Sequence, residues 1–164
     1  KLDKLTDDAI FIDWGYNKDY PFEKHAKILN EKKVKYMLAP GTSTWSTITS
    51  RILDMEKTIL NSATSAKKYN SLGVLVTDWG DIGHLQYLPV SYLGFILGGI
   101  NSWTEATLND AIDYLKMFLN DDYLEYVNKL FFRLSKFFLL CPFNFGISKF
   151  SSSNNSLIKF GQVS

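Results

Sequence analysis

The chain has 164 residues, of which 46% are hydrophobic and 21% are charged, a composition typical of a single globular domain. Its formal net charge is only +1, and the lysines and arginines are spread along the sequence. No basic surface is therefore predicted that would attract nucleic acid. The most apolar stretch, residues 130–150, contains three basic residues and a proline, which favours a segment that does not enter a membrane.

Three short apolar runs, residues 9–12, 34–38 and 72–76, are predicted to be buried strands. Apolar residues at helical spacing predict helices over 22–33 and 48–69. This alternation of strands and helices indicates parallel strands joined by right-handed crossovers, either in a barrel or in an open doubly wound sheet.

Two further helical segments follow the third predicted strand. The first, residues 91–103, contains Gly94, Gly98 and Gly99, so we expect it to pack closely on its neighbours. A second helical pattern runs over residues 105–140.

The ends of the predicted strands favour the barrel over the open sheet. Asp13-Trp14-Gly15 after the first strand recurs as Asp78-Trp79-Gly80 after the third, and Trp45 follows the second strand. In a closed barrel such residues converge on the C-terminal rim, where active sites are built. No glycine-rich phosphate-binding turn follows the first strand, which argues against a nucleotide-binding fold.

The predicted fold class is therefore α/β, with about three βα units of a TIM-type (β/α)8 barrel followed by C-terminal helices. Eight such units usually require about 250 residues, so the chain is either part of a barrel or depends on a partner. We assign residues 1–104 to the partial barrel and residues 105–150 to a helical extension. Residues 151–164, which are rich in Ser and Asn, are predicted to be a disordered tail.

The segment over residues 76–84 is the richest in reactive side chains, because it contains Asp78, Trp79, Asp81 and His84. An indole beside a carboxylate suits a sugar, since the flat ring packs on the C–H face of a pyranose while the carboxylate accepts hydrogen bonds from its hydroxyls. A purely structural alternative is that Asp78 caps a loop, Trp79 fills the rim and His84 packs.

No metal site is predicted. His84 has no Cys, His or Glu partner at metal-ligand spacing. His25 lies in the middle of the helix predicted over residues 22–33, where a surface or packing role is more common than ligation.

Several strings in the sequence resemble the barrel of family 20 glycoside hydrolases, the β-N-acetylhexosaminidases. Trp79-Gly80-Asp81 is similar to the Trp-Gly-Glu motif at the end of their eighth strand. Residues 12–16, 39–45 and 88–92 are similar, in that order, to other parts of strands six to eight and the loops that follow them. The resemblance covers about residues 8–103 and implies the C-terminal part of the barrel.

The resemblance also implies roles for individual residues in binding the sugar. Trp79 would stack on the sugar before the scissile bond, and Asp81, one methylene shorter than the family's Glu, would hold its O4 and O6 hydroxyls. Trp14 and Trp45 would be further walls of the pocket, and Tyr16 would replace the family's acetamide-binding Tyr, which is not matched at the Trp45 loop. The remaining candidates for contact with the sugar are Asp13, Asp78 and His84.

Members of this family remove terminal β-linked N-acetylglucosamine or N-acetylgalactosamine, and the acetamide of the substrate itself attacks the anomeric carbon. Their Asp-Glu pair, which supplies the acid, follows the fourth strand, and no Asp-Glu dipeptide occurs in this chain. We therefore assign no catalytic residue. We also assign no metal and no cofactor. The expected partners are an N-acetylhexosamine-containing glycan and the N-terminal half of the barrel. The alternative is a non-catalytic carbohydrate-binding or interaction module.

Overall fold

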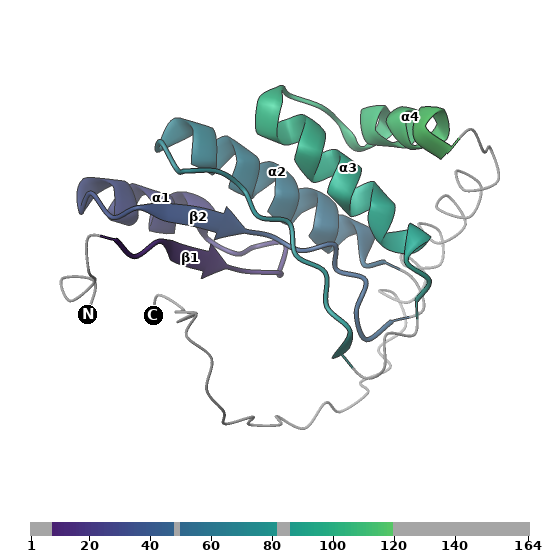
Figure 1. The fold of residues 1–164 in the computed structure, drawn as a ribbon, viewed down its shortest axis with the longest axis horizontal. Coiled ribbons are helices and arrows are strands. Elements are labelled where there is room, and N and C mark those ends of the chain that lie inside the picture. The colour runs from purple at the N-terminus through teal and green to yellow at the C-terminus, as the bar shows by residue number, and fades with distance from the viewer. Residues whose placement is uncertain (1–7, 48–49, 82–85, 120–164) are drawn as a thin grey trace.

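The computed structural model describes residues 8–47, 50–81 and 86–119. In chain order the elements are β1 (Phe11–Trp14), α1 (Phe22–Glu31), β2 (Tyr36–Ala39), α2 (Ile52–Lys68), α3 (Pro89–Trp103) and α4 (Leu108–Leu119). The four helices lie side by side in the order α1, α2, α3, α4, with the strands along one side of this row (Figure 1). The predicted tail, the apolar stretch over residues 130–150 and most of the helical extension lie outside the described residues.

β1 and β2 pair in parallel, with Phe11 opposite Tyr36 and Trp14 opposite Ala39. This pairing agrees with the predicted crossover connection through α1. The observed strands begin about two residues later than the predicted ones, because the register of the pair brings Asp13 and Trp14 into β1 and leaves Ile10 outside, 52% exposed.

The third predicted strand is a bridged segment without a regular strand of its own. Val74 and Thr77 form isolated parallel bridges with Leu38 and Gly41, and the Leu75 N–H donates to the Leu38 carbonyl at 2.9 Å. The ladder is interrupted at Pro40, which has no N–H to donate, although its carbonyl accepts from Thr77 N at 2.9 Å. The bridged segment is thus a parallel neighbour of β2. These strands do not by themselves close a barrel, so the TIM-type barrel stays a prediction.

The helices cover one face of the strands through two apolar clusters. Under α1 the buried residues are Phe22, Ala26, Leu29, Tyr36, Leu38 and Ala66. Between α2, α3 and α4 they are Ile52, Met55, Ile59, Leu93, Leu97, Ala111 and Leu115. Spacings of three and four residues place these side chains on one side of each helix, as the sequence predicted.

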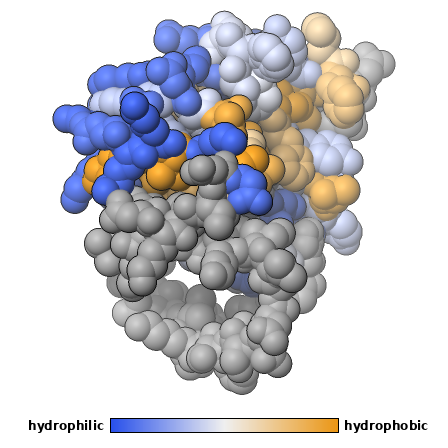
Figure 2. Space-filling model, turned by 60° about the vertical axis from the view of Figure 1, so that its left-hand side comes forward, coloured by the Kyte–Doolittle hydropathy of each residue, from blue (hydrophilic) through white to orange (hydrophobic). Residues whose placement is uncertain are grey.

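The opposite face of the strands has no helix over it among the described elements (Figure 1). Side chains alternate along a strand, so Ile10 and Leu75 point to this face, because Phe11 and Val74 pack under the helices. Ile10 is 52% and Leu75 40% exposed. Figure 2, in which the α1 end of the molecule is turned forward, shows that hydrophobic residues are also exposed between hydrophilic ones on that side. Parallel sheets are normally buried on both faces, so this face is suited to contact with further protein.

Two of the three predicted glycine contacts of α3 are confirmed. A Cβ on Gly94 would lie 3.1 Å from the Thr42 Cα, and one on Gly98 would overlap Cγ2 of Val76. The third prediction is wrong within the described part of the chain, because none of its atoms lies within 4 Å of the position that a Cβ on Gly99 would occupy. Gly99 lies one residue after Gly98 and therefore faces about 100° around the helix from it.

This difference makes a matched pair of variants. Gly98→Ala should lower the free energy of unfolding by about 1–3 kcal/mol, because the new methyl group forces α3 away from Val76. Gly99→Ala should raise it by up to about 1 kcal/mol, because alanine favours the helix and meets no obstacle among the described residues. Urea unfolding measures both. Equal effects of the two substitutions would contradict the close approach of α3 to the bridged segment.

Candidate aromatic site

Four aromatic side chains gather at the C-terminal ends of the strands, and we call them the aromatic cluster: Trp14, Tyr16, Trp45 and Trp79. The Tyr16 ring is at the centre, with its centroid 5.4 Å from that of Trp14, 4.8 Å from that of Trp45 and 6.4 Å from that of Trp79. The three indoles come from three separate segments. The structure therefore brings together the indoles that the sequence placed on one rim.

Trp45 is a buried member of the aromatic cluster, with 8% of its surface exposed. The Tyr16 ring meets it edge-on at 73°, and a Cβ on Gly41 would lie 2.6 Å from its indole. The Arg51 guanidinium lies 5.1 Å from its centroid and also donates to its carbonyl at 3.0 Å. Trp45 is therefore enclosed by protein and supports Tyr16 from behind.

Trp79 is the exposed member, at 39%. Its Nε1–H is directed inward and donates to the Tyr16 hydroxyl at 2.8 Å and to Thr77 Oγ1 at 3.2 Å. An indole held by its N–H edge while much of its surface faces solvent is suited to stacking against a flat ligand.

Thr77 is the residue of the site that the sequence reasoning missed. Its hydroxyl makes contacts with Tyr16 OH at 3.3 Å and with the Pro40 carbonyl at 3.1 Å, in addition to the bond from Trp79. The sequence could have identified Thr77 by its position two residues before Trp79, because residues i and i+2 of an extended segment lie on the same side.

The carboxylate of Asp81 lies at the exposed edge of the site. Burial raises the pKa of Tyr16, and the negative charge of Asp81 adds to this rise. Burial lowers the pKa of Arg51, while the charges of Asp54 and Asp81 oppose that effect. Asp81 thus acts on the central phenol and on the guanidinium behind Trp45, and Tyr16 stays protonated at neutral pH.

Asp78 is held by hydroxyl groups of the loop that follows β2. Its Oδ1 accepts hydrogen bonds from Thr42 Oγ1 at 2.6 Å and Thr44 Oγ1 at 2.7 Å. Thr44 is also 3.0 Å from the hydroxyl of Ser91 in α3, and these three hydroxyl residues are fully buried. The carboxylate therefore joins the bridged segment, the loop and α3 beneath the aromatic cluster.

Asp13 lies on the helix side of β1, away from the aromatic cluster. It is fully buried, accepts a 2.7 Å hydrogen bond from the Tyr20 hydroxyl, and lies 3.1 Å from Nδ1 of His25 in α1. Burial raises the pKa of Asp13, and burial together with this carboxyl raises the pKa of Tyr20. Of the surface and packing roles expected for His25, its burial here agrees with packing. A contact between Asp13 and a sugar stays a prediction.

No group of three or more His, Cys, Asp or Glu residues in the described ranges could hold a metal ion. His84, predicted near the sugar, lies outside the described residues. Within the part of the chain that the structure describes, none of the helices has both the length and the apolarity to cross a membrane.

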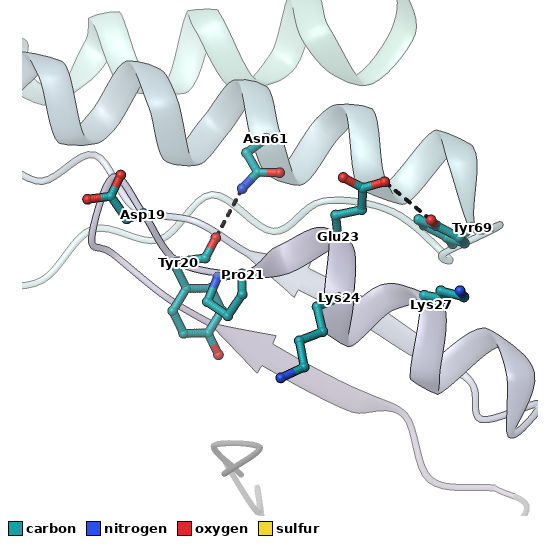
Figure 3. Close-up of a pocket in the computed structure, with 8 residues that line it drawn as sticks. All are labelled: Asp19, Tyr20, Pro21, Glu23, Lys24, Lys27, Asn61 and Tyr69. Carbon is teal, nitrogen blue, oxygen red and sulfur yellow. Dashed lines mark hydrogen bonds between the residues drawn. The ribbon is translucent and has the colours of Figure 1, made fainter.

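A hollow of about 650 Å³ lies between α1 and α2, outside the aromatic cluster. Figure 3 shows Glu23 directed toward Tyr69 on one side of it and Asn61 bound to the Tyr20 carbonyl on the other. Glu23 is also paired with Lys68 at 2.6 Å on the exposed surface. The described residues that line the hollow include no member of the aromatic cluster.

Comparisons of the chain with models of protein families, with curated proteins and with solved structures gave no match.

Proposed function

We propose that the chain is the C-terminal part of a family 20 glycoside hydrolase barrel, and that its aromatic cluster binds the terminal N-acetylhexosamine of a glycan. The observation that carries this proposal is the gathering of three indoles around Tyr16 at the C-terminal ends of parallel strands. Binding sites of parallel α/β folds lie at that end. The resemblance of the strand ends to the family supplies the substrate class.

The exposed side chains give the proposal its chemistry. The face of Trp79 packs on the pyranose, and Asp81 accepts hydrogen bonds from the sugar hydroxyls. Tyr16 OH accepts from Trp79 Nε1 at 2.8 Å and lies 3.3 Å from Thr77 Oγ1, which donates its single hydrogen to the Pro40 carbonyl. The Tyr16 hydrogen is thus directed to Thr77 and can turn to a ligand. Because its pKa is raised, Tyr16 keeps that hydrogen at neutral pH and can donate it to the acetamide carbonyl of the substrate.

The less exposed candidates act through their neighbours. Trp14 and Trp45 form the wall around Tyr16, and Asp78 ties the loop after β2 to the bridged segment. In this proposal the N-terminal half of the barrel covers the open face of the strands and supplies the acid that this chain does not contain.

The second candidate is a non-catalytic carbohydrate-binding module. The lack of an Asp-Glu dipeptide in the chain favours this candidate, because every residue of the proposed site has a role in binding and none is assigned a catalytic step. The two candidates predict the same binding by this chain. They differ when the N-terminal half of a family 20 barrel is supplied in trans, because only the enzyme fragment should then give hydrolysis.

We expect the chain alone to bind N-acetylglucosamine more tightly than glucose, which lacks the acetamide that Tyr16 would hold. Tryptophan fluorescence titration measures the two affinities. Equal binding of both sugars would contradict the acetamide contact.

We also expect the chain alone to hydrolyse no aryl N-acetyl-β-hexosaminide above background, because loss of a general acid alone costs about 10²- to 10⁴-fold in rate. A chromogenic assay measures the hydrolysis. Turnover at an ordinary enzymatic rate would indicate an acid among Asp13, Asp78 and Asp81.

A further inference from the structure

Thr77 connects the polar atoms at the centre of the aromatic cluster to the backbone of the sheet. Its Oγ1 accepts from Trp79 Nε1 at 3.2 Å, lies 3.3 Å from Tyr16 OH and donates to the Pro40 carbonyl at 3.1 Å. These contacts join the exposed indole, the central phenol and the end of β2 through one hydroxyl group.

The main chain of Thr77 is fixed on both sides of its side chain. Its N–H donates to the Pro40 carbonyl, and its carbonyl accepts from the Thr42 N–H, each at 2.9 Å. A β-branched side chain also has few rotamers. The hydroxyl therefore has a fixed position in the sheet, whereas the ring of Trp79 is 39% exposed and would otherwise be free to rotate about its side-chain bonds.

We propose that Thr77 is a positioning residue that fixes the ring plane of Trp79 and the hydroxyl of Tyr16 before a ligand arrives. A ring held in its binding orientation loses little rotamer freedom when a sugar stacks on it. Removing the Thr77 hydroxyl should therefore weaken sugar binding by about three- to tenfold. Only this binding effect rests on the proposed function. The control of the Trp79 indole by Thr77 stands independently of any ligand.

The test uses the ¹⁵N-labelled chain and follows the indole N–H signals of its four tryptophans, with the Trp79 signal assigned from Trp79→Phe. Thr77→Val removes the hydroxyl and keeps the β-branched shape, and Thr77→Ser keeps the hydroxyl. Thr58→Val is the control for the same substitution, because Thr58 is even more buried than Thr77 and its hydroxyl bonds, among the described residues, to backbone carbonyls of its own helix. The probe ligand is N-acetylglucosamine.

In Thr77→Val we expect the Trp79 indole proton to move upfield and to exchange faster with water. Sugar binding should weaken in parallel, while Thr77→Ser restores both properties and Thr58→Val changes neither. An unchanged Trp79 signal in folded Thr77→Val overturns the inference, and the proposed function then still stands if the wild type binds the sugar. A moved signal without sugar binding by the wild type upholds the positioning role and contradicts the proposed function.

The wild type alone also tests the inference if Thr77→Val does not fold. Its Trp79 indole proton should exchange with water more slowly than that of Trp103, which is 91% exposed. Equal exchange rates for the two would mean that Trp79 is not held, and would overturn the proposal.

Discussion

Replacing Asp13 with alanine is expected to lower the free energy of unfolding by about 3 kcal/mol, because two polar groups lose their acceptor and each unsatisfied buried group costs about 1–3 kcal/mol. These groups are the Tyr20 hydroxyl and Nδ1 of His25, which lies in a residue only 6% exposed. Such a loss is a large part of the 5–15 kcal/mol that is typical of a native protein. Urea unfolding followed by far-UV circular dichroism measures it.

Asp19→Ala is the control for the same substitution, because Asp19 is exposed in the connection that follows β1. Its effect should be within about 0.5 kcal/mol of zero, as is usual for exposed positions. If Asp13→Ala unfolded like the wild type but lost sugar binding, Asp13 would contact the ligand directly, as the sequence-based hypothesis allowed. The structure would then have to present this carboxylate on the other face of β1.

The helices were the most predictable part of the fold, because each buries one apolar face. The expected helix over residues 22–33 becomes α1 (Phe22–Glu31), and the expected helix over 91–103 becomes α3 (Pro89–Trp103). The helix expected over 48–69 begins later, at Ile52. There the Arg51 N–H donates to the Ser43 carbonyl at 3.0 Å and so stays with the loop. Contacts of this kind between loop and helix have no periodic signal in the sequence.

The strands were harder to place because burial of a polar residue depends on its tertiary partners. Asp13 ends an apolar run in the sequence, and this suggested that the strand stopped before it. The structure includes it in β1, since Tyr20 and His25 bind its carboxylate under α1. Pro40 had the opposite effect on the third strand, because its missing N–H interrupts the ladder with β2.

The grouping of the three indoles was predictable from the repeated strand-end strings, but their unequal exposure was not. Trp45 is 8% and Trp79 39% exposed, although each follows a strand and each lies beside Tyr16. The difference arises from the way the loop after β2 folds back on itself, since Arg51 and Gly41, both close to Trp45 in the chain, cover its indole. A sequence pattern can place a side chain at a strand end, but only packing decides whether its face is open to a ligand.

Trp79→Ala is expected to weaken binding of N-acetylglucosamine by about 2 kcal/mol, the cost of truncating an aromatic hot spot, which corresponds to about 30-fold in Kd. Trp79 contributes the exposed ring of the aromatic cluster, so its removal takes away the stacking face. The unfolding midpoint should change much less than in Asp13→Ala, because much of the ring already faces solvent. Fluorescence titration is unsuitable here, since the substitution removes a fluorophore, and isothermal titration calorimetry measures the affinity.

Trp103→Ala is the matched control for this substitution. It removes the same side chain from the end of α3, where the indole is 91% exposed and lies outside the aromatic cluster. We expect the Trp103→Ala variant to bind the sugar with the same affinity as the wild type. Equal losses of affinity in Trp79→Ala and Trp103→Ala would mean that the sugar binds to any exposed indole and not to a defined site. Full affinity in a folded Trp79→Ala would remove the stacking role and, with it, the main support for a sugar site at these strand ends.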